Sequence, residues 1–207
     1  GLVKYYDMSG HIDRNNSKYT SSLQKHFKAM QLAETNELIN YLPRIYNNIG
    51  VVYRRIDEFT SGINFHLKSL KAAEAVNDKS SMSYAYNSIG NIDSLSKQYE
   101  KALEYFQKGL DYGELIKNKR SIAINLNNIG EVYEFMEQYE KSIEYYAKSL
   151  AYNLEINNIK GLGISYDCIG NIYRKTGKFE KALSYYMKGL EMHQKHGEDL
   201  FLAITLK

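Results

Sequence analysis

The sequence predicts an all-α protein, a stack of antiparallel helix pairs, on three observations. A motif centred on an Ile-Gly pair recurs every forty residues, at Gly50, Gly90, Gly130 and Gly170. The apolar residues around each copy recur at spacings of three or four, which is the period of one helix face. The chain has one Pro and 14 Gly, too few turn formers for an all-β protein. A fixed period of this length is typical of stacked repeat proteins.

Each repeat divides into two helical patterns. In the third repeat the first pattern places these residues on one face: Ile122, Leu126, Ile129 and Tyr133. The second pattern begins at an aromatic residue, at Tyr19, Phe59, Tyr99, Tyr139 and Phe179. Short polar segments such as 56–58 separate the two, and they are long enough only for antiparallel neighbours. Pro43 falls in the first turn of its helix, where a missing N–H does no harm.

The repeats predict one continuous solenoid fragment over residues 1–207. Its units run approximately over 1–37, 38–78, 79–118, 119–158 and 159–198, with the start of a sixth at 199–207. The chain starts without Met inside one repeat and stops inside another, so we expect an excised piece of a longer protein. Self-association is expected through apolar residues left uncovered at the end, namely Leu200, Phe201, Leu202 and Ile204.

The recurrent glycines predict a close helix contact. Gly inside a helix is less stable than Ala by about 1 kcal/mol, so a neighbouring helix must leave no room for a Cβ. The second helix offers a small residue at a matching phase, at Gly62, Ala102, Ser142 and Ala182. We therefore expect small residues to face the glycines.

Several function classes are excluded by composition and motif. The net charge of +3 is small and the basic residues are spread through every repeat, which does not indicate nucleic-acid binding. Cys168 is the single Cys and has no evident His partner, so we predict no disulfide, no Cys-based zinc site and no thiol nucleophile. His193 and His196 lack further ligands, and no apolar run approaches the roughly 18 residues of a membrane span. Without a phosphate loop or hydrolase motif, we predict neither enzyme activity nor a cofactor or metal.

The recurring residues resemble the tetratricopeptide repeat, in which an aromatic residue precedes Leu-Gly and then Tyr, followed by Ala-x3-Phe in the second helix. The matching residues are Tyr46-x2-Ile49-Gly50-x2-Tyr53 and Ala102-x3-Phe106. His66 replaces the second-helix aromatic in its repeat, no Pro closes a repeat, and the period is forty instead of about 34. The longer period looks like that of kinesin light chains, spindle-adaptor proteins and bacterial peptide-sensing regulators.

The resemblance implies a right-handed superhelix whose first helices line a concave groove that binds a protein or peptide segment. By spacing, the groove face carries Arg44, Asn47, Asn48, Arg54, Tyr84, Asn87, Asn91, Asn127, Asn128, Glu131, Asp167, Asn171 and Arg174. Asn is a mediocre helix former, so a column of Asn needs a cause.

Two interpretations of the Asn column remain open. Its amides can pair with the backbone of an extended peptide, as similar Asn residues do in the family, or they can tie adjacent repeats together. The charges at Arg44, Glu131 and Arg174 likewise fit either a ligand of mixed charge anchored by carboxylates near Arg, or a solvated face. An alternative function is a sensor region of a larger bacterial signalling protein, a histidine kinase or transcriptional regulator, whose output domain lies outside the fragment.

Overall fold

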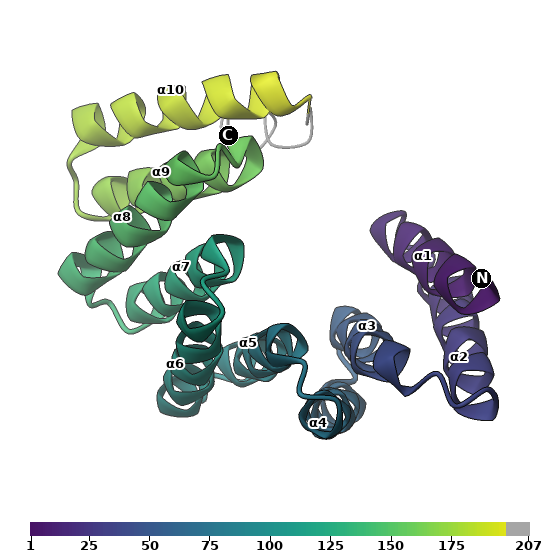
Figure 1. Cartoon of the computed structure of the whole chain (residues 1–207). Coiled ribbons are helices and arrows are strands. Elements are labelled where there is room, and N and C mark those ends of the chain that lie inside the picture. The colour runs from purple at the N-terminus through teal and green to yellow at the C-terminus, as the bar shows by residue number, and fades with distance from the viewer. Residues whose placement is uncertain (198–207) are drawn as a thin grey trace. The chain divides into compact units, whose positions relative to one another are not determined.

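The computed structural model describes residues 1–197 and is all-α over that range (Figure 1). Its elements are α1 (Leu2–Asn15), α2 (Tyr19–Thr35), the 3-10 helix η1 (Ile39–Tyr41), α3 (Leu42–Arg55), α4 (Phe59–Ala75), α5 (Lys79–Leu95), α6 (Tyr99–Leu115), α7 (Lys119–Phe135), α8 (Tyr139–Glu155), α9 (Ile159–Lys175) and α10 (Phe179–His196). The expected sixth repeat, with Leu200, Phe201, Leu202 and Ile204, lies outside the described residues.

Consecutive helices pack as pairs, α1 with α2 and so on to α9 with α10, which lie side by side at the green and yellow end of Figure 1. Every second helix begins at the expected aromatic residue, and Pro43 stands in the first turn of α3. The predicted stack of antiparallel helix pairs, an α-solenoid, is therefore confirmed.

The chain forms two compact units, Gly1–Ile116 and Lys117–Lys207. Within the first unit α2 packs on α3 and α4 packs on α5, while α3 also contacts α5. Within the second unit α8 packs on α9 and α7 contacts α9. In each unit, then, the first helices of successive pairs are neighbours. None of the helices in residues 1–197 is long and apolar enough to cross a membrane.

Each turn between helices contains one residue in the left-handed region. These residues recur every twenty positions, with φ between 49° and 75°, at Ser17, Glu37, Asp57, Asn77, Lys97, Lys117, Glu137, Asn157, Gly177 and Gly197. The N–H of the left-handed residue and the N–H of the residue after it reach back to the helix end, as when Lys97 N donates to Ser94 O at 2.9 Å and Gln98 N to Asp93 O at 2.8 Å. Carbonyls that a helix end leaves unpaired are thereby satisfied.

A flat ring of the second helix leaves no room for a Cβ on each motif glycine. The expectation that small residues face the glycines is therefore incomplete. A Cβ on Gly90 would lie 2.8 Å from the Phe106 ring, and one on Gly130 would lie 2.8 Å from the Tyr146 ring. The small residue four positions before the ring still contacts the glycine backbone, since Ser142 Oγ donates to Gly130 O at 2.8 Å. The ring of the second helix thus packs directly against the glycine.

Candidate functional site

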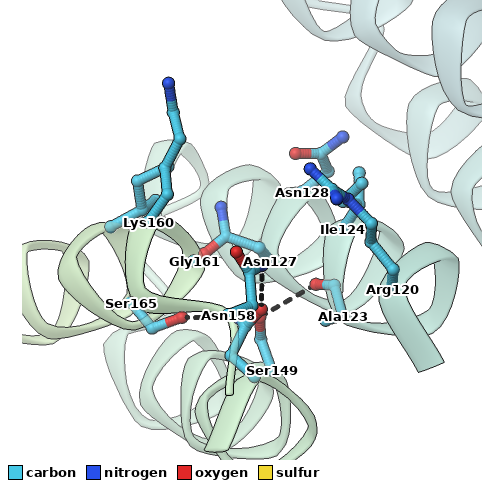
Figure 2. A pocket seen from close by; sticks show the side chains of 12 residues that line it. Arg120, Ala123, Ile124, Asn127, Asn128, Ser149, Asn158, Lys160, Gly161 and Ser165 are labelled. Carbon is cyan, nitrogen blue, oxygen red and sulfur yellow. Dashed lines mark hydrogen bonds between the residues drawn. The ribbon is translucent and has the colours of Figure 1, made fainter. Parts of the chain in front are cut away.

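The second unit contains an open pocket of about 260 Å³ between α7, α8 and α9 (Figure 2). Its lining residues are Arg120, Ala123, Ile124, Asn127 and Asn128 of α7, Ser149 and Asn153 of α8, Asn158 at the start of α9, and Lys160, Gly161, Ile164 and Ser165 of α9. Half of these residues carry an amide or a hydroxyl, and none is acidic. The first helices α7 and α9 form the walls.

The floor of the pocket is a hydrogen-bonded polar network (Figure 2). Asn158 Nδ2 donates to Asn153 Oδ1 at 2.7 Å, and Asn153 Nδ2 donates to Ser165 Oγ at 3.4 Å. Ser149 Oγ accepts from Asn153 Nδ2 at 3.3 Å and donates to Ala123 O at 2.8 Å. Asn153, Ser149 and Ser165 are buried. The floor therefore satisfies its own polar groups, as buried polar groups require.

Gly161 keeps this floor intact, because a Cβ there would collide with the amides of Asn153 and Asn158. The repeat places different residues at the equivalent positions of the other junctions. Ser81 and Ser121 stand where this junction has Gly161, and Ala33, Ala73 and Gly113 stand where it has Asn153. The pairing of an amide with a glycine thus distinguishes this junction and opens space at its surface.

The walls of the pocket offer polar groups that the floor does not use. Asn127 Oδ1 is buried and has no hydrogen-bond partner among the described residues. Arg120 and Lys160 are exposed, and each is the second residue of its helix, where the N-terminal end of the helix dipole adds positive potential. Such a site suits a ligand that brings a hydrogen-bond donor for Asn127.

In the first unit a charged cluster occupies the equivalent region of the predicted groove face. Asp7 Oδ1 accepts from Asn48 Nδ2 at 2.8 Å and lies 3.0 Å from His26 Nδ1, while Asp7 Oδ2 accepts from Arg44 Nε at 2.9 Å. Arg14 Nη1 donates to Asn48 Oδ1 at 3.3 Å. Asp7, His26 and Asn48 are buried. Asn48 therefore ties α3 to α1, which is the structural interpretation that the sequence left open.

The electrostatics of this unit favour a fixed charge at Asp7 and a neutral ring at His66. Burial acts to raise the pKa of Asp7, but hydrogen bonds from His26 and Asn48 and the charge of Arg44 outweigh it and hold the pKa below its usual value. His66 is fully buried, and neither ring nitrogen finds a hydrogen-bond partner within residues 1–197. Burial lowers the pKa of His66 to about 3, so the ring is neutral at physiological pH.

Several of the expected groove residues are used within the chain. Asn91 Nδ2 donates to Asn87 O at 2.8 Å and to Asn87 Oδ1 at 3.0 Å, so the two amides form a pair one turn apart on α5. Tyr186 Oη donates to Asn171 Oδ1 at 2.7 Å, which links α10 to α9. These amides have partners already and are weaker candidates for contacting a ligand than Asn127.

Asp167 also turns inward. Its Oδ2 lies 2.7 Å from Nε2 of His193, a buried ring on α10. Burial raises the pKa of Asp167, and the hydrogen bond with His193 opposes this. His193 therefore pairs with a carboxylate, and within the described part of the chain no three His, Cys, Asp or Glu side chains gather closely enough to hold a metal ion.

The remaining expected residues lie on the surface or at its edge. Glu131 and Arg174 are exposed, and Tyr84 and Arg54 are half-buried. Asn47 is also half-buried, and its Oδ1 is hidden from solvent without a hydrogen-bond partner in residues 1–197, like that of Asn127. Asn47 and Asn127 occupy the same place in their repeats.

Several residues of the charged cluster and the pocket depart from the repeat, and spacing did not identify them. Asp7 stands in the same column as Asn47 and Asn127, and the change from Asn to Asp was the available signal for the charged cluster. Asn153 likewise breaks a column of small residues. The basic residues at the pocket, Arg120 and Lys160, precede the stretch of groove face that the sequence identified.

The profile of the tetratricopeptide repeat family matches residues 41–114 and 121–195. Solved structures with a similar fold include a Rap protein complexed with competence and sporulation factor, at 17% identity and a TM-score of 0.88, over 99% of this chain and 57% of that one. The apo quorum sensor NprR from B. thuringiensis is 18% identical with a TM-score of 0.75, over 99% of this chain and 56% of that one. BtubC from P. vanneervenii is 16% identical with a TM-score of 0.76, over 95% and 82% of the two chains.

At these identities the likeness concerns the fold, and the chain spans just over half the length of the Rap and NprR structures. No curated protein matches the chain in sequence. The family profile covers well over half of the 207 residues, in two stretches that include the motif glycines of the second to fifth repeats. The chain belongs to the tetratricopeptide repeat family.

Proposed function

We propose that this chain is a non-enzymatic module that binds a peptide or protein segment along the first helices of its repeats. The observation that carries the proposal is the pocket between α7 and α9, on the face where the sequence places the groove. Asn127 Oδ1, buried there without a partner, fits a backbone N–H of an extended peptide. In support, a Rap protein of similar fold is complexed with competence and sporulation factor, and another with the Phr* peptide.

The proposed contact set is narrower than the Asn column. Asn48 is committed to the charged cluster, and Asn87 and Asn91 pair with each other. Asn127 and Asn128 in the second unit therefore carry the main contacts, with Asn47 as their counterpart in the first. A preformed groove on packed helices limits the ordering that binding requires of the receptor.

A display library of random twelve-residue peptides tests the proposal. Wild-type protein is expected to enrich a defined family of peptides, whose affinity is then measured by calorimetry. Asn127→Ala removes the unfilled acceptor and should weaken binding about threefold to tenfold, as expected for one hydrogen bond. Its thermal stability should not fall, because Asn127 Oδ1 has no partner among residues 1–197.

Gln194→Ala is the matched control, since it removes an exposed amide from α10 of the same unit. Failure to enrich any peptide would contradict the proposal. Equal affinities for Asn127→Ala and Gln194→Ala would exclude Asn127 from the contact.

A second candidate is the sensor region of a larger signalling protein. The observation that favours it is the fold shared with the quorum sensor NprR and with Rap proteins, of which this chain spans just over half. Sequencing the gene on both sides of the coding segment tests it. A histidine kinase or DNA-binding domain in the same reading frame would support this function, and a frame without an output domain would rule it out.

A further inference from the structure

Two positions on neighbouring first helices form an ion pair in the second unit but carry like charges in the first. In the second unit Lys175 Nζ of α9 lies 2.8 Å from Glu134 Oε1 of α7. Three repeats earlier, the same two positions hold Arg55 of α3 and Arg14 of α1. The acid that attracts a base in the second unit is therefore replaced by a second base in the first.

Arg14 is half-buried, and no acid balances its charge directly. Its Nη1 donates to Asn48 Oδ1 at 3.3 Å and its Nη2 to His11 Nδ1 at 2.8 Å. Neither Arg14 nor Arg55 forms an ion pair within the described part of the chain. Burial and the charge of Arg55 lower the pKa of the Arg14 guanidinium. Asp7 opposes this shift, but three other side chains already engage its oxygens.

A buried nitrogen without a partner belongs to the same place in the repeat. In the second unit Tyr146 Oη of α8 donates to Glu134 Oε2 at 2.8 Å. His26 of α2 takes the place of Tyr146 in the first unit, is fully buried, and has no hydrogen-bond partner for Nε2 within residues 1–197. Its Nδ1 lies 3.0 Å from Asp7 Oδ1, so Nε2 is on the side of the ring away from that carboxylate. Buried polar groups rarely stay unpaired, so this nitrogen suits an acceptor from a ligand.

The second unit shows how an oxyanion is held at this place. There the carboxylate of Glu134 is bound by one cation and one hydroxyl. In the first unit two guanidinium groups and an imidazole stand at the equivalent positions, with no acid among them. Guanidinium groups bind phosphate through paired N–H donors, and a phosphomonoester carries close to two negative charges at pH 7. The greater positive charge therefore favours a phosphate over a carboxylate.

Helix capping alone does not explain these arginines. A base in the last turn of a helix interacts favourably with the helix dipole. That role needs no second base facing it, and Ser94 and Glu134 take the place of Arg14 in two other repeats. The facing pair thus has a cost that the helix ends do not require.

We infer that the first unit contains an anion site for a phosphomonoester, bound by Arg14, Arg55 and His26. The phosphate takes the place that the Glu134 carboxylate has in the second unit, and the imidazolium of His26 donates to it through Nε2 while Nδ1 stays with Asp7. The phosphate belongs either to a phosphorylated residue of a peptide or to a small phosphorylated molecule. This site goes beyond the proposed peptide binding and does not depend on it.

Isothermal titration calorimetry with inorganic phosphate at constant ionic strength tests the inference. Wild-type protein should bind one phosphate per chain, and acetate about tenfold more weakly or less. Arg14→Gln and Arg55→Gln should each weaken phosphate binding about tenfold, as expected when one charge-assisted contact is lost. Lys28→Gln, which removes an exposed basic residue from α2 of the same unit, is the matched control and should leave phosphate binding unchanged.

Arg14→Glu is the sharpest variant, because it recreates the acid–base pair of the second unit. It should abolish phosphate binding and raise the thermal unfolding temperature in phosphate-free buffer, since an attraction to Arg55 replaces a repulsion. If Arg14 served only the end of α1, the same variant would unfold at a lower temperature.

Peptides with a central phosphoserine and random flanking residues separate the two sources of phosphate. An affinity about tenfold or more above that of inorganic phosphate identifies a phosphorylated peptide, and an equal affinity identifies a small phosphorylated molecule. The inference is overturned if neither probe binds saturably, if acetate binds as tightly as phosphate, or if both glutamine variants retain wild-type affinity.

Discussion

The two compact units share one backbone repeat but fill the space between successive helix pairs with different chemistry. In the first unit the buried carboxylate of Asp7 joins His26, Arg44 and Asn48. In the second, neutral amides and hydroxyls around Asn153 form a floor beneath an open pocket. The helix lengths and turns of the two units are nearly the same. A few side chains that break the repeat therefore decide what each junction does.

The first junction serves cohesion between helices, whereas the second is the one proposed for recognition. A buried charge that loses its partner is strongly destabilising, so the first junction is committed to holding its helices together. A neutral network that satisfies itself does not depend on the side chains at its rim, so the second junction is the one at which we propose contacts with a ligand.

Asp7→Ala should destabilise the first unit by about 3 to 5 kcal/mol, because His26, Arg44 and Asn48 lose a shared buried acceptor. Urea unfolding with hydrogen exchange resolved by helix measures the loss in α1 to α4. The folded pKa of Asp7 is depressed, so its contribution is present above the unfolded value of about 3.9 and is lost as the pH falls through the folded pKa. Asp111→Asn, which changes an exposed carboxylate, is the control. Equal stabilities of the Asp7→Ala and Asp111→Asn variants would refute a cohesive role for Asp7.

Gly161→Ala should destabilise the second unit by about 1 to 3 kcal/mol, as overpacking does, because the new Cβ collides with Asn153 and Asn158. Asn153→Ala introduces the alanine that the earlier repeats have at the equivalent positions, Ala33 and Ala73, and should relieve most of the clash. A double-mutant cycle by chemical denaturation measures the coupling. Additive effects of the two changes would show that the amide floor is not what Gly161 protects.

His66→Phe should alter the pH dependence of the stability of the first unit. Burial lowers the pKa of His66 to about 3, so wild-type stability falls as the pH drops from about 6.5 toward 3, by up to about 1.4 kcal/mol per pH unit. Phe106 occupies the same place over Gly90, so Phe should fit over Gly50. Thermal melts at a series of pH values should lose this part of the slope in His66→Phe.

The reciprocal change Phe106→His should introduce a similar slope, because Phe106 is buried in the equivalent position. An unchanged pH profile in both variants would mean that the buried ring does not couple protonation to folding.

Lys97→Gly and Glu137→Gly should each stabilise the chain by up to about 1 kcal/mol. Both residues have positive φ, 60° and 58°, which an L residue adopts at a cost of about 1 to 2 kcal/mol, partly offset by the greater chain entropy of Gly. The gains should be equal because the two units share this turn. Gly177→Ala is the reverse test, and an increase in stability in that variant would contradict this explanation.

The fold could be predicted from the sequence because it depends on local pattern repeated in phase. The aromatic starts of the second helices and the motif glycines follow from spacing alone. The ring that packs against each glycine could not be predicted from spacing alone, because helical side chains lean toward the N-terminus of their own helix. The ring of Tyr146 therefore reaches Gly130 from one turn beyond the small residue Ser142.

The candidate site was only partly predictable. Spacing placed Asn127 and Asn128 on the predicted groove face, and both line a pocket in the structure. Spacing also placed Asn48 on that face, but its partner Asp7 lies 41 residues earlier. That pairing depends on how one helix pair sits against the next, which periodicity within a helix does not describe. One interpretation of the Asn column thus holds at Asn48, and the other stays a prediction for Asn127.

The helix pair α5 and α6 gives no side chain to either the Asp7 cluster or the lining of the α7–α9 pocket. The repeat that contains this pair, residues 79–118, is bounded by turns of the same form as those elsewhere in the chain. Unequal crossing-over within the gene would duplicate or remove such a module as a whole. A descendant protein would then keep both polar sites while changing the length of chain between them.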